Sequence, residues 1–112
     1  MSISSPLAAA IARRNVEPDG RIWHSGAVVA PTLEHVRAIR IETRAQMRER
    51  AAMLRALRAL PAAAPVEDVR AVLPVDSSDC TRDGAIARYE RIEDDARQYL
   101  ADLELARRMW GK

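Results

Sequence analysis

The sequence predicts an all-α protein: a long antiparallel helical hairpin, with a short N-terminal helix and an irregular arm before it. Two observations carry this prediction. Residues 33–60 contain no Gly or Pro and consist mostly of residues with high helix propensity. Residues 89–110 repeat apolar side chains at alternating spacings of three and four, which is the periodicity of one side of a helix. Two long segments of nearly equal length, about 20 residues apart, indicate a hairpin of two helices.

The N-terminal segment, residues 1–31, is predicted to be a separate short helix and turn-rich arm. Ser5 suits the cap of the short helix and Pro6 suits its first turn, while the alanines that follow favour its interior. The Pro-Asp-Gly sequence at residues 18–20 is a turn signal, with short extended runs on either side. The arm is therefore expected to be either a small hairpin or irregular.

The second predicted domain, residues 32–112, is the helical hairpin itself. Thr32 is a good cap for a helix over about residues 33–60, which ends before a proline. A linker with one or two helical turns follows. The last helix is predicted over about residues 82–110, with Gly111 as its stop. Three residues ahead of it can serve as its cap: Ser78, Asp79 and Thr81.

The apolar row of the last helix is predicted to be its packing face. Its members are Tyr89, Ile92, Ala96, Tyr99, Leu103, Ala106 and Trp110. This row has the spacing of a coiled coil and is expected to lie on the broad apolar side of the first long helix. An antiparallel arrangement then places Trp110 near Leu33 and Val36. Trp23, in the arm, lies outside this row and is instead a candidate for contact with a partner.

The first long helix carries more apolar surface than one partner helix can cover. Beside its apolar side runs a strip of small residues, with Ile41 among them. The alanines of this strip are Ala38, Ala45, Ala52, Ala56 and Ala59. The chain also has no Phe, so its own core is thin and packing against a second copy would help it. These features predict a homo-oligomer, either a dimer or a ring, unless the N-terminal helix or the linker helix covers the strip.

Six arginines of the first long helix fall within an arc of roughly 80°. They are Arg37, Arg40, Arg44, Arg48, Arg55 and Arg58. This arginine stripe fits two interpretations: pairing with the acidic residues that flank the packing face of the last helix, or binding phosphates or an acidic partner. Residues 1–60 hold ten Arg against five Asp or Glu, a net charge of +5. No aromatic residues interleave with the arginines, which favours internal pairing.

The residue patterns of metal sites and enzymes are not found in the sequence. His24, His35 and Cys80 do not fall at the spacing of metal ligands. Cys80 is the single cysteine, and its general base would have to be a histidine distant in sequence, so we interpret it as a loop or capping residue. No Gly-rich phosphate loop, nucleophile elbow or zinc-binding motif appears. We therefore expect no metal, no cofactor and no enzymatic activity.

The sequence is most consistent with a non-enzymatic protein–protein interaction or assembly module: a small adaptor, a regulator or an oligomeric structural subunit. The alternative is a nucleic-acid-associated accessory protein, of phage-packaging or plasmid type, that contacts phosphates through the arginine stripe. The first residues lack the cationic start of a signal peptide, and no uncharged stretch approaches the roughly 20 residues of a membrane helix. We expect a cytoplasmic protein without membrane contact.

Overall fold

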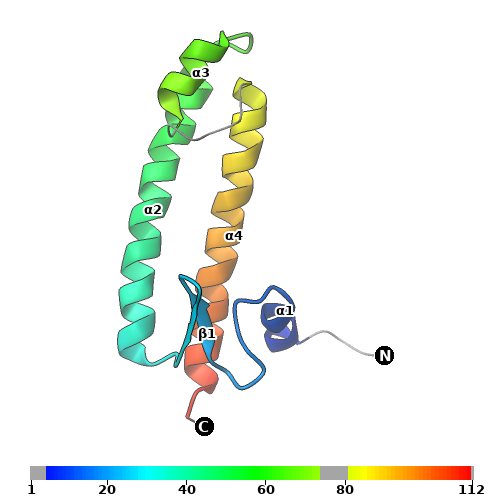
Figure 1. The fold of residues 1–112 in the computed structure, drawn as a ribbon, viewed down its shortest axis with the longest axis vertical. Helices are drawn as coiled ribbons and strands as arrows, with labels where there is room; N and C mark the ends of the chain where they lie inside the picture. Colours follow the sequence, from blue (N-terminus) through cyan, green and yellow to red (C-terminus); the bar gives the residue numbers. More distant parts are fainter. Residues whose placement is uncertain (1–4, 74–80, 112) are drawn as a thin grey trace. The chain divides into compact units, whose positions relative to one another are not determined.

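The computed structural model describes residues 5–73 and 81–111 (Figure 1). Helices account for 69% of these residues, and a small two-stranded sheet accompanies them. The elements in chain order are α1 (Pro6–Ala12), β1 (Ile22–His24), β2 (Ala27–Val29), α2 (Leu33–Ala59), α3 (Val66–Val72) and α4 (Arg82–Met109). The predicted predominance of helices is confirmed, and both long helices end within one residue of their predicted bounds.

The chain divides into two compact units. The first comprises residues 1–44 and 96–112, and the second comprises residues 45–95. Each long helix therefore contributes one part to each unit, and each unit has its own hydrophobic core. Residues 5–31, which the sequence assigns to a separate domain, belong to the first unit.

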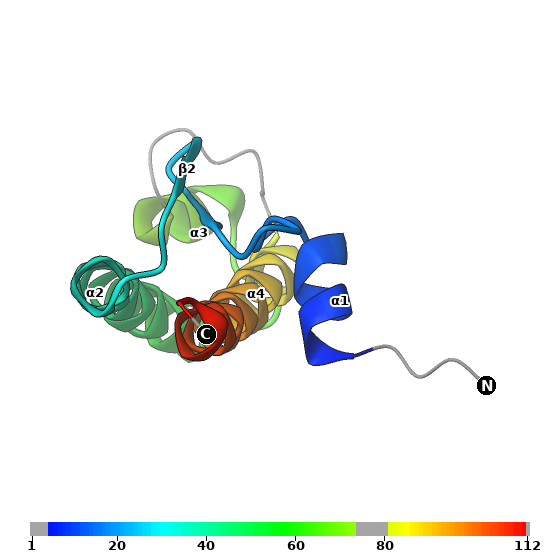
Figure 2. The ribbon, with the colours of Figure 1, turned by 90° about the horizontal axis from the view of Figure 1, so that it is seen from below.

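In the first unit, α1 begins as the sequence predicts. The Ser5 hydroxyl accepts a 3.0 Å hydrogen bond from the backbone N–H of Ala8, and Pro6 occupies the first turn. The chain leaves the helix through Arg14, which adopts a left-handed conformation with φ of 61°. Figure 2 shows α1 lying beside the C-terminal part of α4.

The arm forms a small hairpin, which is one of the two arrangements expected from the sequence. β1 and β2 pair antiparallel, with Ile22 opposite Val29 and Trp23 opposite Val28. Ser25 and Gly26 connect the strands, and both have positive φ, which is the geometry of a two-residue turn that matches the twist of paired strands. An isolated bridge from Val16 to Ile22 extends the sheet on its other side.

The core of the first unit joins the arm and α1 to both long helices. Its buried members are Ala10, Val16, Ile22, Val36, Ile39, Leu103 and Ala106. Ile22 and Leu103 are completely buried, and they come from the hairpin and from α4. Because the arm supplies aliphatic side chains to this core, it compensates in part for the absence of Phe from the chain.

The second unit packs the later part of α2, α3 and the early part of α4 together. Its buried members are Leu54, Leu57, Val69, Leu73, Ala85 and Tyr89. Within this unit α2 and α4 run antiparallel, since Arg50 pairs with Glu93 while the later Leu57 meets the earlier Arg82. The Arg82 guanidinium donates to the backbone carbonyls of Leu57 and Arg58, which satisfies two acceptors at the end of α2.

The start of α4 is capped by one of the three predicted residues. The Thr81 hydroxyl accepts a 3.1 Å hydrogen bond from the backbone N–H of Gly84. Ser78 and Asp79, the other two candidates, and Cys80, interpreted as a loop or capping residue, lie outside the described residues.

Candidate protein-contact surface

The predicted packing row of α4 lies mostly in the two cores. Tyr89, Leu103 and Ala106 are buried, and Ile92 and Tyr99 pack against the cores from their edges. Ala96 is half-buried. Trp110, at the end of the row, is 39% exposed.

Trp110 makes a contact that the sequence did not indicate. Its ring lies against Gly20 of the arm, so close that a Cβ added to this glycine would come within 3.2 Å of the ring. Gly20 has φ of 96°, a conformation that favours glycine. The end of α4 is therefore tied to the turn of the arm that the Pro-Asp-Gly sequence predicted.

Trp23 is fixed by its backbone rather than by its side chain. Its carbonyl oxygen accepts a 2.7 Å hydrogen bond from the Tyr99 hydroxyl of α4. Burial, with the nearby Glu42 carboxylate, raises the pKa of Tyr99 to about 12, so the hydroxyl stays a donor at neutral pH. The neighbouring His24 lies 3.3 Å from Glu42 through Nε2. These contacts hold the hairpin on α2 and α4, and the Trp23 side chain remains 37% exposed.

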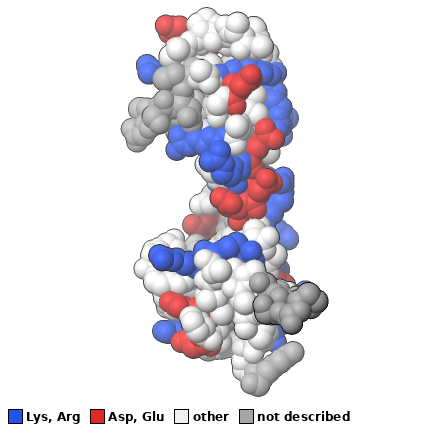
Figure 3. Space-filling view, turned by 90° about the vertical axis from the view of Figure 1, so that its right-hand side faces the viewer, with Lys and Arg blue, Asp and Glu red and all other residues white. Residues whose placement is uncertain are grey.

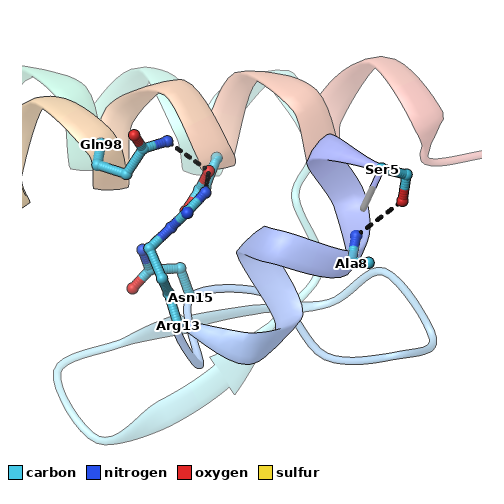
Figure 4. A network of polar contacts seen from close by, with 6 residues as sticks. Ser5, Ala8, Arg13, Asn15 and Gln98 are labelled. Carbon is cyan, nitrogen blue, oxygen red and sulfur yellow. Dashed lines mark hydrogen bonds and ion pairs between the residues drawn. The ribbon is translucent and has the colours of Figure 1, made fainter. Parts of the chain in front are cut away.

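A second anchor of the arm centres on Asp102 of α4, which is 2% exposed (Figure 4). Its carboxylate accepts two hydrogen bonds from the Arg13 guanidinium, at 2.9 and 2.8 Å. Asn15 donates a third, at 2.9 Å, and Gln98 a fourth, at 3.1 Å. Burial raises the pKa of Asp102, but these hydrogen bonds outweigh it and hold the pKa below its ordinary value.

Sequence reasoning missed the role of Asp102. It lies on the acidic flank of the packing row, and no local pattern distinguishes it from Asp95, which is exposed one heptad earlier. What sets Asp102 apart is the return of the N-terminal arm to this part of α4.

The arginine stripe divides into paired and unpaired members. Arg40 forms a 2.6 Å ion pair with Glu104, and Arg58 lies 3.6 Å from Glu90. Hydrogen bonding from Arg107, with the charges of Arg40 and Arg108 nearby, lowers the pKa of Glu104 to about 2. The stripe members without an ion pair in the described part of the chain are Arg37, Arg44, Arg48 and Arg55, all of them exposed.

Charges of both signs are intermixed elsewhere on the molecule. On the face drawn in Figure 3, acidic and basic side chains of the described residues lie among one another rather than in one basic area.

Two large aliphatic side chains are exposed to solvent on the side of α2 that faces away from the core. Ile41 is 65% exposed and Leu33 is 55% exposed. Together with Glu34, Arg37 and Ala38 they line a shallow depression on the helix surface. The opposite side of the same helix part is buried in the core of the first unit. This part of α2 is thus apolar on two opposite sides. The core of the first unit covers one side, and the side that carries Ile41 is exposed.

Charged residues of opposite sign flank this outward apolar column. At 100° per residue, Ala38, Ile41 and Ala45 form its centre. Arg37 and Arg44 lie on one flank of the column, and Glu42 and Glu49 lie on the other, all four exposed. We call these seven residues the α2 surface: Arg37, Ala38, Ile41, Glu42, Arg44, Ala45 and Glu49.

Two other depressions are lined differently. One, of about 440 Å³, lies in the first unit beside Trp110 and Gly20. Another, of about 540 Å³, lies in the second unit over the Arg50 side chain and Tyr89. Among residues 5–73 and 81–111, no group of three or more His, Cys, Asp or Glu is placed to hold a metal ion. Within the same residues, no helix has the length and apolar character needed to cross a membrane.

No protein-family model, curated protein or solved structure matches this chain.

Proposed function

We propose that this chain is a non-enzymatic protein–protein interaction or assembly module, and that the α2 surface is its contact site. A small adaptor, a regulator and an oligomeric structural subunit are the roles that fit such a module. The observation that carries the proposal is Ile41, a large aliphatic side chain that is 65% exposed on an ordered helix. Exposed apolar side chains that stand alone are common, but Ile41 lies in a continuous column with Ala38 and Ala45.

The energetic reason is the hydrophobic effect. Burying a side chain of this size against a partner contributes on the order of 1.5–3 kcal/mol when it is complete. The alanines beside Ile41 let another backbone approach closely, which increases the contact area per residue. The charged flanks keep the isolated chain in solution and restrict which partner can dock.

The finer architecture belongs to the same proposal. We propose that α2 and α4 form one antiparallel hairpin along their full lengths, with residues 1–31 as a separate segment docked on it, and that the chain works as an oligomer in the cytoplasm. In each unit the paired parts of the two helices fit this arrangement. A single cysteine in the sequence is compatible with a reducing compartment.

The alternative function is contact with nucleic acid through the arginine stripe. Arg37, Arg44, Arg48 and Arg55, which form no ion pair with the described residues, support it, because exposed guanidinium groups in a row can follow a phosphate backbone. Against it, phosphate binding leaves the exposed Ile41 side chain and the acidic flank of Glu42 and Glu49 unexplained. Arg40 and Arg58 are also occupied by carboxylates. A protein contact accounts for the arginines, the glutamates and Ile41 together.

The test compares native complexes of the wild-type chain and Ile41→Glu, each purified with a tag from the cells that make it. Ile41→Glu replaces an exposed residue with a good helix former, so the fold should be retained. Ala101→Glu is the matched control, because Ala101 is also exposed on a helix. We expect a complex containing protein and no nucleic acid, lost in Ile41→Glu and retained in the control.

Two results would contradict this function. One is a complex that contains nucleic acid and dissociates steeply with salt, which would support the phosphate-binding alternative. The other is wild-type chain that is free in the cell and indistinguishable from Ile41→Glu.

A further inference from the structure

We propose that the α2 surface binds the same surface of a second copy of this chain, with the two α2 helices parallel and in register. This inference rests on the proposed function and adds to it the identity and orientation of the partner. It is carried by the order of the charges along the surface rather than by its apolar residues alone.

The residues of the surface fall at the positions of a two-stranded coiled coil. Ala38, Ile41 and Ala45 repeat at spacings of three and four and occupy its seam. Arg37 and Arg44 then hold the flanking position before each seam alanine. Glu42 and Glu49 hold the flanking position on the other side. Glu42 directly follows Ile41, and Glu49 comes one heptad after Glu42.

In a parallel pair, the flanking residue of one helix faces the opposite flank of its partner five residues further along. Arg37 therefore meets Glu42 of the second copy, and Arg44 meets Glu49. Two-fold symmetry repeats both contacts, so four pairs of opposite charge form around the seam. All four of these residues are exposed and accessible for such pairing.

An antiparallel pair would bring like charges together. Reversal of one helix places each flank opposite the same flank of the partner, so Arg37 faces Arg44 of the second copy, twice over. The antiparallel pair gains one favourable contact in return, between Glu34 of one copy and Arg48 of the other at each end of the seam. In the parallel pair, Glu34 instead faces Glu34 of the second copy and Arg48 faces Arg48, both at the solvated ends of the seam. The charges therefore favour the parallel orientation.

The contact is short, and this sets its strength. Arg48 interrupts the apolar seam after Ala45, and Arg55 does so again one heptad later. We therefore expect a reversible dimer that dissociates on dilution, weakened but not abolished by high salt because the seam is apolar. The Glu42 carboxylate already lies 3.3 Å from His24, so Glu49 is the cleaner acidic position to change.

Orientation can be measured by cysteine cross-linking in the full-length chain with Cys80→Ser. In the parallel pair, Ala38→Cys faces its own copy and should form a disulfide-linked dimer on mild oxidation. In the antiparallel pair, the two copies of residue 38 are about 10 Å apart along the helix, too far for a disulfide. Ala45→Cys should also link to itself, and Ala101→Cys on α4 is the control that should not.

Charge exchange tests the pairing itself. Arg37→Glu/Arg44→Glu should weaken self-association at least tenfold, and so should Glu42→Arg/Glu49→Arg. Mixing the two variants should restore the dimer, since each then offers the flank that the other needs. Circular dichroism of each variant alone checks that α2 is retained.

The inference is overturned if Ala38→Cys does not link to itself while a mixture of Ala38→Cys and Ala45→Cys does, which is the antiparallel result. It is also overturned if the wild-type chain stays monomeric at every concentration. If an Ile41-dependent complex then contains a different protein, the α2 surface remains a protein-contact site, and the second copy and the proposed oligomer are excluded. If it contains nucleic acid, the proposed function and this inference both fail.

Discussion

Arg13 and Asp102 lie 89 residues apart in the sequence and are joined by two hydrogen bonds. The carboxylate side chain is 3% exposed and also accepts from Asn15 and Gln98. This relationship fixes the start of the arm on α4, directly before Val16 and Ile22 enter the core of the first unit. A buried carboxylate thus organises the part of the chain that supplies its aliphatic core.

Asp102→Ala should destabilise the first unit. Hydrogen bonds to a charged group each contribute about 1.5–3 kcal/mol, but Arg13 and Asn15 regain water when the carboxylate is removed. We therefore expect a net loss of about 2 kcal/mol in the free energy of unfolding, measured by urea denaturation. Asp95→Ala, at an exposed carboxylate, is the control and should change stability by less than about 0.5 kcal/mol. Equal effects of the two substitutions would exclude the anchoring role.

Stability should fall with acid because carboxylates of the described residues, Asp102 and Glu104 among them, have lowered pKa values in the folded chain. The pKa of Asp102 lies below its ordinary value, and the pKa of Glu104 is lowered to about 2. A lowered pKa means that the unfolded chain takes up protons first. The contribution of these groups is therefore complete above about pH 5 and is lost as the pH falls from about 4 toward 2. The urea concentration at the unfolding midpoint should fall over this pH range. It should fall less in Asp102→Asn, because the asparagine side chain has no proton to gain.

Two ion pairs of the second unit that join α2 to α4 should contribute unequally to stability. Arg50 and Glu93 are 2.7 Å apart, with side chains 18% and 8% exposed. Glu93→Gln removes the negative charge opposite Arg50 in a largely buried site. We expect the free energy of unfolding to fall by about 2–3 kcal/mol. Arg58 and Glu90 are 3.6 Å apart with half-exposed side chains, so Glu90→Gln should cost less than about 1 kcal/mol. Thermal or urea unfolding of both variants measures the difference.

Gly20 and Gly26 provide a matched pair for the Trp110 contact. Both have positive φ, so alanine is strained at either site, by about 1–2 kcal/mol. At Gly20 the added Cβ also meets the Trp110 ring, whereas nothing lies within 4 Å at Gly26. Gly20→Ala should therefore be the more destabilising and should alter the Trp110 fluorescence in a Trp23→Phe background. An unchanged Trp110 spectrum in Gly20→Ala would show that the ring does not rest on the arm.

The helices could be predicted because their signals are local. Ser5, Thr32 and Thr81 each accept a capping hydrogen bond from the backbone three residues later. Glycine and proline at the segment ends then fix where helices stop, and apolar spacing identifies the buried side. These signals depend on residues within one or two turns, so they can be read without knowledge of the fold.

The polar contacts between the helices and the arm could not be predicted in the same way. Arg50 is the arginine of α2 that departs from the stripe, and it forms the most buried ion pair with an α2 arginine. Asp102 likewise resembles its exposed neighbours in sequence. Which charged residues become buried depends on how segments distant in sequence meet, and helical periodicity carries no information about that. The place of Ile41 among alanines could be read from the sequence, whereas its exposure and the pairing of Arg40 with Glu104 required the structure.

The central claim is that the α2 surface is buried against another protein, a second copy of this chain. Light scattering after size exclusion, at several concentrations and at low and high salt, tests it most directly. One chain has a mass of 12.5 kDa. We expect the wild-type mass to rise toward twice that value with concentration at either salt, and Ile41→Glu to stay at the mass of one chain. A wild-type mass of one chain throughout, or an oligomer that Ile41→Glu leaves intact, would contradict the claim.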